Sequence, residues 1–203
     1  MAKIKWIGII KDACAPVAVL PDDAKRIDEP ENPTELQKKA LPYGAVSLAL
    51  CIAVMLVKTI SAGARTVNPF AILLFIILFL PIMLFLHEIM HAIVYPPEAM
   101  AEIGFAPKHF AAMVLVSHPL SRRRFLLSTL APAALGIIPL VLFIITPPSW
   151  HFLNSLTFSL YCIGFITPYP DYFMAVNILR QVPKNAVVQF SGDRTYWFSG
   201  DGR

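Results

Sequence analysis

The chain has 203 residues, of which 57% are hydrophobic and 15% are charged, and its mean hydropathy is +0.63. Soluble domains carry roughly 25% charged residues, and the apolar residues here gather in long runs, so the composition excludes an ordinary soluble domain and favours bilayer-spanning helices. The formal net charge of +4 reflects Lys and Arg residues whose positions set membrane orientation, and we expect no nucleic-acid partner.

The segment before the first apolar run, residues 1–42, is polar and lacks the apolar region of a cleavable signal peptide. We expect it to stay in the cytoplasm, with the first span acting as its own insertion signal. Within it, residues 3–10 are interpreted either as a short strand or as an interfacial segment. Residues 22–39 are interpreted as a solvated loop followed by a short amphipathic turn.

Four apolar runs follow, and each is long enough to cross about 30 Å of hydrocarbon as a helix. They predict an all-α polytopic membrane protein with about four transmembrane helices, at about residues 43–61, 69–95, 125–145 and 151–179. The chain then divides into a cytoplasmic N-terminal segment, a membrane-embedded domain and a cytoplasmic C-terminal tail, at residues 1–42, 43–181 and 182–203.

The loop at residues 98–124 contains one apolar stretch, residues 110–116, that is short enough to be a strand. A cytoplasmic β-hairpin is one interpretation of this loop. A segment that packs on the spans without pairing is the other.

The Lys and Arg residues alternate along the predicted topology. Seven precede the first span and four lie in the central loop, whereas the link after the first span carries only Arg65 and the link before the fourth carries none. Because Lys and Arg mark cytoplasmic segments, we expect both termini in the cytoplasm. We also expect an integral protein of a bacterial cell membrane, with the lipid bilayer as its surroundings.

The second predicted span ends in the pattern H-E-x-x-H, formed by His87, Glu88 and His91. Residues four apart lie on one face of a helix, so both imidazoles can bind one Zn²⁺. The intervening glutamate lies beside the metal and can accept a proton from water. Three ionisable groups at membrane depth are costly unless they form a site, and the pattern therefore predicts zinc ligands at His87 and His91 and a catalytic base at Glu88.

A catalytic zinc requires a third protein ligand. Asp171 is our prediction, because it is the one carboxylate in the second half of the membrane region. In the predicted topology the second and fourth spans run in the same direction, and at ~1.5 Å per residue His87 and Asp171 both lie ~27–30 Å from the outer end. An interfacial acid paired with Arg180 or with an N-terminal lysine is the alternative for Asp171. The other candidate ligands are Glu98, Glu102, His109 and His118.

These motifs resemble those of the site-2-protease-like membrane metalloproteases, in which a helix-borne HExxH is completed by an aspartate from a proline-containing segment of a later span. Here that segment is Pro168-Tyr169-Pro170-Asp171. From about residue 40 onward the chain is most similar to the DUF3267 family of zincin peptidases, with His118-Pro119 before a basic cluster and Val182-Pro183-Lys184-Asn185-Ala186 after the fourth span. One departure is Tyr172, which follows the aspartate where the site-2 group has glycine.

The resemblance implies a membrane-embedded zinc endopeptidase that acts on membrane-associated polypeptides near the cytoplasmic face. Two alternatives stay open: a non-proteolytic zinc binder or inactive scaffold, and a structural four-helix protein with an incidental motif. Two histidines and a carboxylate also suit Fe(II), but the glutamate beside the first histidine favours hydrolysis with Zn²⁺.

Overall fold

The computed structural model describes residues 1–10, 15–107 and 111–200, so His109 and Phe110 lie outside the described residues. The chain forms two compact units, and each unit combines segments that are distant in sequence. The first consists of residues 1–36, 88–131 and 171–203, and the second of residues 37–87 and 132–170.

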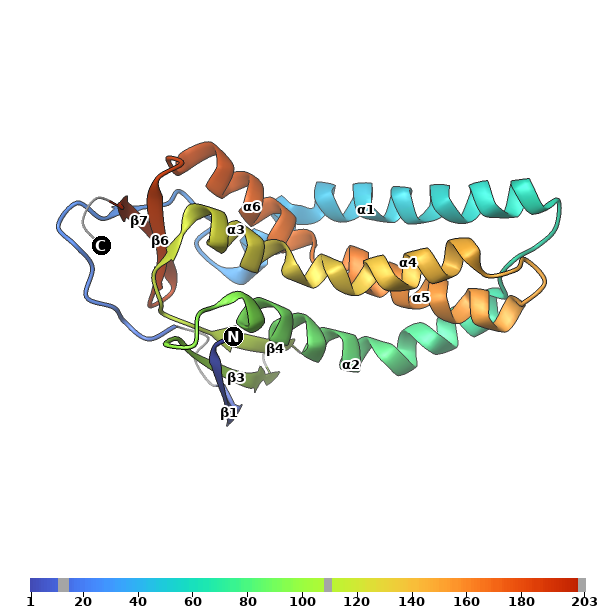
Figure 1. The fold of residues 1–203 in the computed structure, drawn as a ribbon, viewed down its shortest axis with the longest axis horizontal. Coiled ribbons are helices and arrows are strands. Elements are labelled where there is room, and N and C mark those ends of the chain that lie inside the picture. The colour runs from blue at the N-terminus through green and yellow to red at the C-terminus, as the bar shows by residue number, and fades with distance from the viewer. Residues whose placement is uncertain (11–14, 108–110, 201–203) are drawn as a thin grey trace. The chain divides into compact units, whose positions relative to one another are not determined.

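The first unit contains two small β-sheets (Figure 1). In the three-stranded sheet β1 pairs parallel with β3, and β3 pairs antiparallel with β4. In the four-stranded sheet the order is β2-β7-β6-β5, and every pair is antiparallel. The strands are β1 (Lys3–Ile9), β2 (Lys25–Arg26), β3 (Met100–Ala106), β4 (Ala111–Leu115), β5 (Leu120–Ser121), β6 (Ala186–Ser191) and β7 (Arg194–Ser199).

The two sheets correct the expectation of an all-α protein: the fold is mixed. The antiparallel pairing of β3 and β4 confirms the hairpin interpretation of the central loop, and β1 confirms the strand interpretation of residues 3–10. The predicted tail is an ordered hairpin, in which β6 and β7 are joined at Gly192 with a φ of 63°. A positive φ at the first of two turn residues suits tight hairpins and is readily adopted by glycine.

Side chains from both sheets and from the helices of this unit form its hydrophobic core. Ile27, Ile178 and Val188 are fully buried there, and Phe125 and Val182 are nearly so. Ile178 belongs to α6 (Tyr169–Gln181) and Phe125 to α3 (Arg122–Leu130). The core therefore fixes these two helices against the sheet that contains β5 and β6.

The second unit is helical. Its elements are α1 (Pro33–Ala62), most of α2 (Pro69–Val94), α4 (Ala134–Ile145) and α5 (His151–Ile166), and the short 3₁₀ helix Ala131–Ala133 links α3 to α4. The helices α4 and α5 approach closely at Gly136 and Gly164, where a Cβ atom on Gly164 would lie 2.5 Å from the Gly136 nitrogen. Small residues allow this kind of backbone approach between apolar helices.

Lys58 is held inside the second unit. Its ammonium donates to the carbonyls of Phe143 and Thr146 at the end of α4, and to Oδ1 of Asn154 at 2.6 Å. Lys58 therefore caps a neighbouring helix, because the last carbonyls of α4 have no partners within their own helix.

Three helical segments are long and apolar enough to cross a membrane: Pro33–Ala62, Pro69–Val94 and Arg122–Ile145. In the apolar part of each of these helices, between 11% and 28% of the residues are buried. Most of the side chains of the three helices therefore face outward, as lipid-facing residues do. The fourth expected span is two helices, α5 and α6, which are separated at Thr167 and the buried Pro168. Proline at this position removes a backbone donor and favours a break.

Candidate metal centre

The HExxH pattern occupies the last two turns of α2. The apolar residues of α2 before this pattern form a helix that continues through Pro81. The helix ends at Val94, before Pro96 and Pro97. One nitrogen or oxygen atom from each of His87, Glu88 and His91 lies within 4.8 Å of the others, and the side chain of His87 is buried. The i, i+4 spacing of the helix therefore brings three metal-ligating groups together.

Ser128 of α3 orients the second histidine. The Nδ1 atom of His91 lies 2.9 Å from the carbonyl oxygen of Ser128, and the Ser128 hydroxyl donates to the His91 carbonyl, also at 2.9 Å. A carbonyl can only accept, so the proton of the neutral imidazole is on Nδ1 and the lone pair is on Nε2. The lone pair on Nε2 is then the one that can bind a metal, and the hydrogen bond to the carbonyl holds the ring in place.

Asp171 lies on the Nε2 side of the His91 ring. It belongs to the first turn of α6, and its Oδ1 is 3.6 Å from Nε2 of His91. Both side chains are mostly buried, with 19% and 15% of their area exposed. Asp171 is outside the group formed by the three α2 residues, but its carboxylate is the acidic group brought next to the predicted ligand atom of His91.

Glu88 is anchored by a backbone amide. Its Oε2 accepts a hydrogen bond of 2.9 Å from the amide of Val114, in β4. Because this amide points to Glu88 and not to β3, it lies on the free edge of the three-stranded sheet. This hydrogen bond holds one of the two oxygens of the Glu88 carboxylate.

The other predicted candidates have different surroundings. Glu102 lies on β3, and its Oε1 is 3.3 Å from the Lys5 ammonium. Glu98 lies in the turn after Pro97, and His118 lies between β4 and β5. Among the described residues, the metal-ligating group contains only residues of α2.

The donor set fits zinc. Imidazole nitrogen and carboxylate oxygen are common zinc ligands, at roughly 2.0–2.2 Å from the metal. Two such ligands in a tetrahedral site are roughly 3.3–3.5 Å apart, close to the 3.6 Å between Asp171 and His91. Ser128 was not predicted as part of the site, because a serine in an apolar run has no sequence signal that separates a contact to histidine from ordinary helix packing.

Helices that fit a membrane, two small sheets and an HExxH group oriented by a backbone carbonyl define a mixed α and β protein with a zincin-type site. The chain belongs to the DUF3267 family, described as "Putative zincin peptidase", whose model matches residues 80–187. This range covers the HExxH group and Asp171, and it confirms the family predicted from the motifs. No curated protein and no solved structure matches the chain.

Proposed function

We propose that the protein is a membrane-embedded zinc metalloendopeptidase that hydrolyses peptide bonds of membrane-associated polypeptides near the cytoplasmic face. The observation that carries this proposal is the orientation of His91. Its Nδ1 faces the Ser128 carbonyl and its Nε2 faces Asp171. This arrangement presents a nitrogen lone pair and a carboxylate to one point, beside a glutamate in the same helix.

In this proposal His87, His91 and Asp171 hold the zinc ion and Glu88 is the catalytic base. When bound, zinc supplies a Lewis acid that lowers the pKa of water to about 7 and polarises a carbonyl. Glu88 accepts the proton of the attacking water on its carboxylate and later donates it to the leaving amine. The hydrogen bond from the Val114 amide keeps the Glu88 carboxylate in position through both transfers.

The free edge of β4 gives the proposal a place for the substrate. Backbone groups that face one edge recur at every second residue, so the edge that presents the Val114 amide also presents groups of Ala112. In the described part of the chain β4 has one neighbouring strand, β3. An extended polypeptide can add to such an edge by backbone hydrogen bonds, with its carbonyls beside Glu88. A helical substrate would first have to unwind locally.

The test compares zinc content and cleavage in the purified full-length wild type and in Glu88→Gln, with a disordered protein such as casein and a single-span membrane polypeptide as substrates. We expect stoichiometric zinc in both proteins and cleavage by the wild type alone. Glu98→Gln is the matched control, since it changes an acid near the motif, and should retain both properties.

The outcomes separate the alternatives. Zinc without cleavage of either substrate by the wild type would favour a non-proteolytic zinc-binding membrane protein or an inactive protease-like scaffold. A wild type purified with no stoichiometric metal, and unable to take up added zinc, would contradict both the peptidase and the zinc-binding alternatives.

A further inference from the structure

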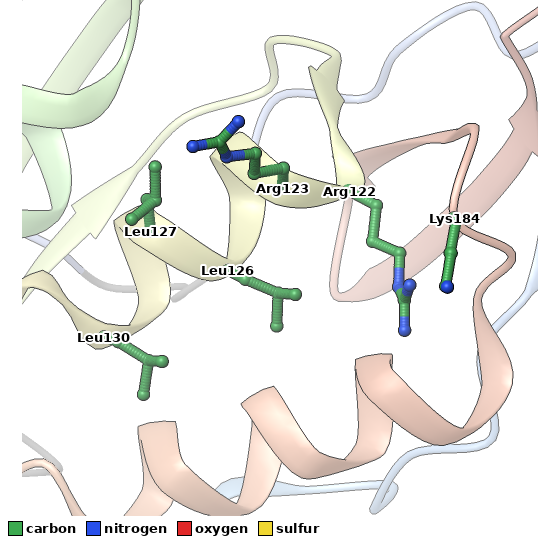
Figure 2. Close-up of a pocket in the computed structure, with 6 residues that line it drawn as sticks. All are labelled: Arg122, Arg123, Leu126, Leu127, Leu130 and Lys184. Atoms are coloured by element: carbon green, nitrogen blue, oxygen red, sulfur yellow. The ribbon is translucent and has the colours of Figure 1, made fainter.

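A second site lies in the first unit between α3 and the chain that follows α6. It is a pocket of about 390 Å³ lined by three basic residues and three leucines: Arg122, Arg123, Lys184, Leu126, Leu127 and Leu130. Figure 2 shows Arg122 and Lys184 extending from different elements toward one opening, with Leu126 and Leu130 further along α3. None of these residues has a part in the proposed peptidase reaction.

The three cations of this pocket have no acidic partner in the part of the chain that the structure describes. Among the described residues, no carboxylate forms an ion pair with Arg122, Arg123 or Lys184. One guanidinium nitrogen of Arg122 donates to the Leu179 carbonyl at 3.0 Å, and its Nε is buried with no hydrogen-bond partner in the described chain. Arg123 and Lys184 are exposed. The pocket therefore presents a local positive charge and spare donors.

The leucines continue the pocket along an apolar surface. Residues four apart lie on one face of a helix, so Arg122, Leu126 and Leu130 form a single line along α3. Leu127 and Leu130 are 56% and 41% exposed. This line begins the candidate span Arg122–Ile145, so its cations lie at the polar end of the span and its leucines extend toward the hydrocarbon.

We propose that this pocket binds an anionic phospholipid, with its phosphate between Arg122 and Lys184 and an acyl chain along the leucines of α3. Phosphate is an acceptor that arginine and lysine bind well, and clustered basic residues at a membrane surface attract anionic lipids. The exposed leucines favour a lipid over a free phosphate ion, because a small anion would leave them in water.

The lipid would bind next to the contact between two helices of the candidate metal centre. The bond from Arg122 to Leu179 joins α3 to α6, and these helices carry Ser128 and Asp171. At 3.6 residues per turn Ser128 lies roughly 120° around α3 from Arg122, so the two residues lie on different faces of the helix and the headgroup does not compete with His91. The proposal rests on the chain being embedded in a membrane, and not on its peptidase activity.

The test is a lipid titration of the full-length protein in detergent, followed by native mass spectrometry. Phosphatidylglycerol is compared with phosphatidylcholine, which has no net charge. We expect tighter binding of phosphatidylglycerol by the wild type. Since each basic residue near an anionic surface contributes about 1 kcal/mol, Lys184→Gln should weaken this binding roughly fivefold and Arg123→Gln/Lys184→Gln roughly 30-fold.

The matched control is Lys3→Gln/Lys38→Gln, which removes the same charge at exposed positions outside the pocket and should bind phosphatidylglycerol as the wild type does. Equal affinity for the two lipids, or the same loss in the control, would overturn the proposal. Glycerol phosphate tests for a small-anion site: full displacement of phosphatidylglycerol by an equal concentration would also overturn it. Zinc content and cleavage are measured separately, so failure here leaves the peptidase proposal intact.

Discussion

His91 and Ser128 exchange hydrogen bonds: the imidazole Nδ1 donates to the Ser128 carbonyl and the Ser128 hydroxyl donates to the His91 carbonyl, both at 2.9 Å. The contact joins the end of α2 to α3 and fixes the ring of one predicted zinc ligand. Loss of the hydrogen-bond partner of a metal-bound histidine typically lowers the metal affinity by about 10–100-fold.

Ser128→Ala should weaken zinc binding by up to about tenfold, because it removes the hydroxyl that holds the two backbones together but keeps the carbonyl acceptor. Competition with a fluorescent zinc chelator measures the affinity. Thr129→Val is the control, since the Thr129 hydroxyl donates to the Phe125 carbonyl within α3. Equal zinc affinities in both variants and the wild type would contradict a role for Ser128 in positioning His91.

Asp171→Ala should lower zinc affinity by more than about 100-fold, as expected for a lost ligand compared with a lost ligand partner. Elemental analysis of the purified protein and the same chelator competition measure the effect. Glu98→Ala is the control carboxylate near the motif. An Asp171→Ala protein with full zinc affinity would refute the assignment of Asp171 and leave the two histidines as ligands.

Gly164→Ala should destabilise the second unit by about 1–3 kcal/mol, the usual cost of an atom forced into a packed interface. Its Cβ would lie 2.5 Å from the nitrogen and 2.8 Å from Cα of Gly136, so α4 and α5 would have to separate. Thermal unfolding of the detergent-solubilised protein measures this. Gly44→Ala should not destabilise, because its Cβ would be 3.4 Å from Tyr169; equal losses in both variants would contradict the close helix contact.

Glu29 should make the first unit less stable as pH rises. Burial raises the pKa of Glu29 above its ordinary value of 4.5, although hydrogen bonds from the Thr195 amide and hydroxyl, at 2.7 and 2.8 Å, act in the opposite direction. A carboxyl with a raised pKa in the folded state binds its proton more tightly there. Its contribution is complete below pH 4.5 and is lost as pH rises through the folded-state pKa.

Glu29→Gln should therefore remove part of the decrease in unfolding temperature between pH 4 and the neutral range. Scanning fluorimetry across this range measures the slope. Asp23→Asn is the comparison with the opposite sign, because the hydrogen bond from the Ser199 amide lowers the pKa of Asp23. A slope in Glu29→Gln identical to that of the wild type would show that Glu29 does not control it.

Local patterns in the sequence were enough to predict the metal-binding helix, the apolar helices and the family. The HExxH pattern brings its residues together through the i, i+4 geometry of a single helix, and a membrane-spanning helix is predicted from the length of one apolar run. Neither prediction requires knowledge of distant residues. The same holds for the hairpin of β3 and β4, whose strands are neighbours in the chain.

The groups that orient the site residues, and the pairing of β1 with β3, depend on contacts between distant segments. β1 pairs with β3 across almost 100 residues, and the partner of His91 is a backbone carbonyl 37 positions away. Backbone atoms are the same in every residue, so no side-chain pattern marks which carbonyl meets Nδ1 or which amide meets Glu88. The sequence specified the ligand types and their spacing along α2, whereas packing of α3, α6 and β4 decided how those ligands are oriented.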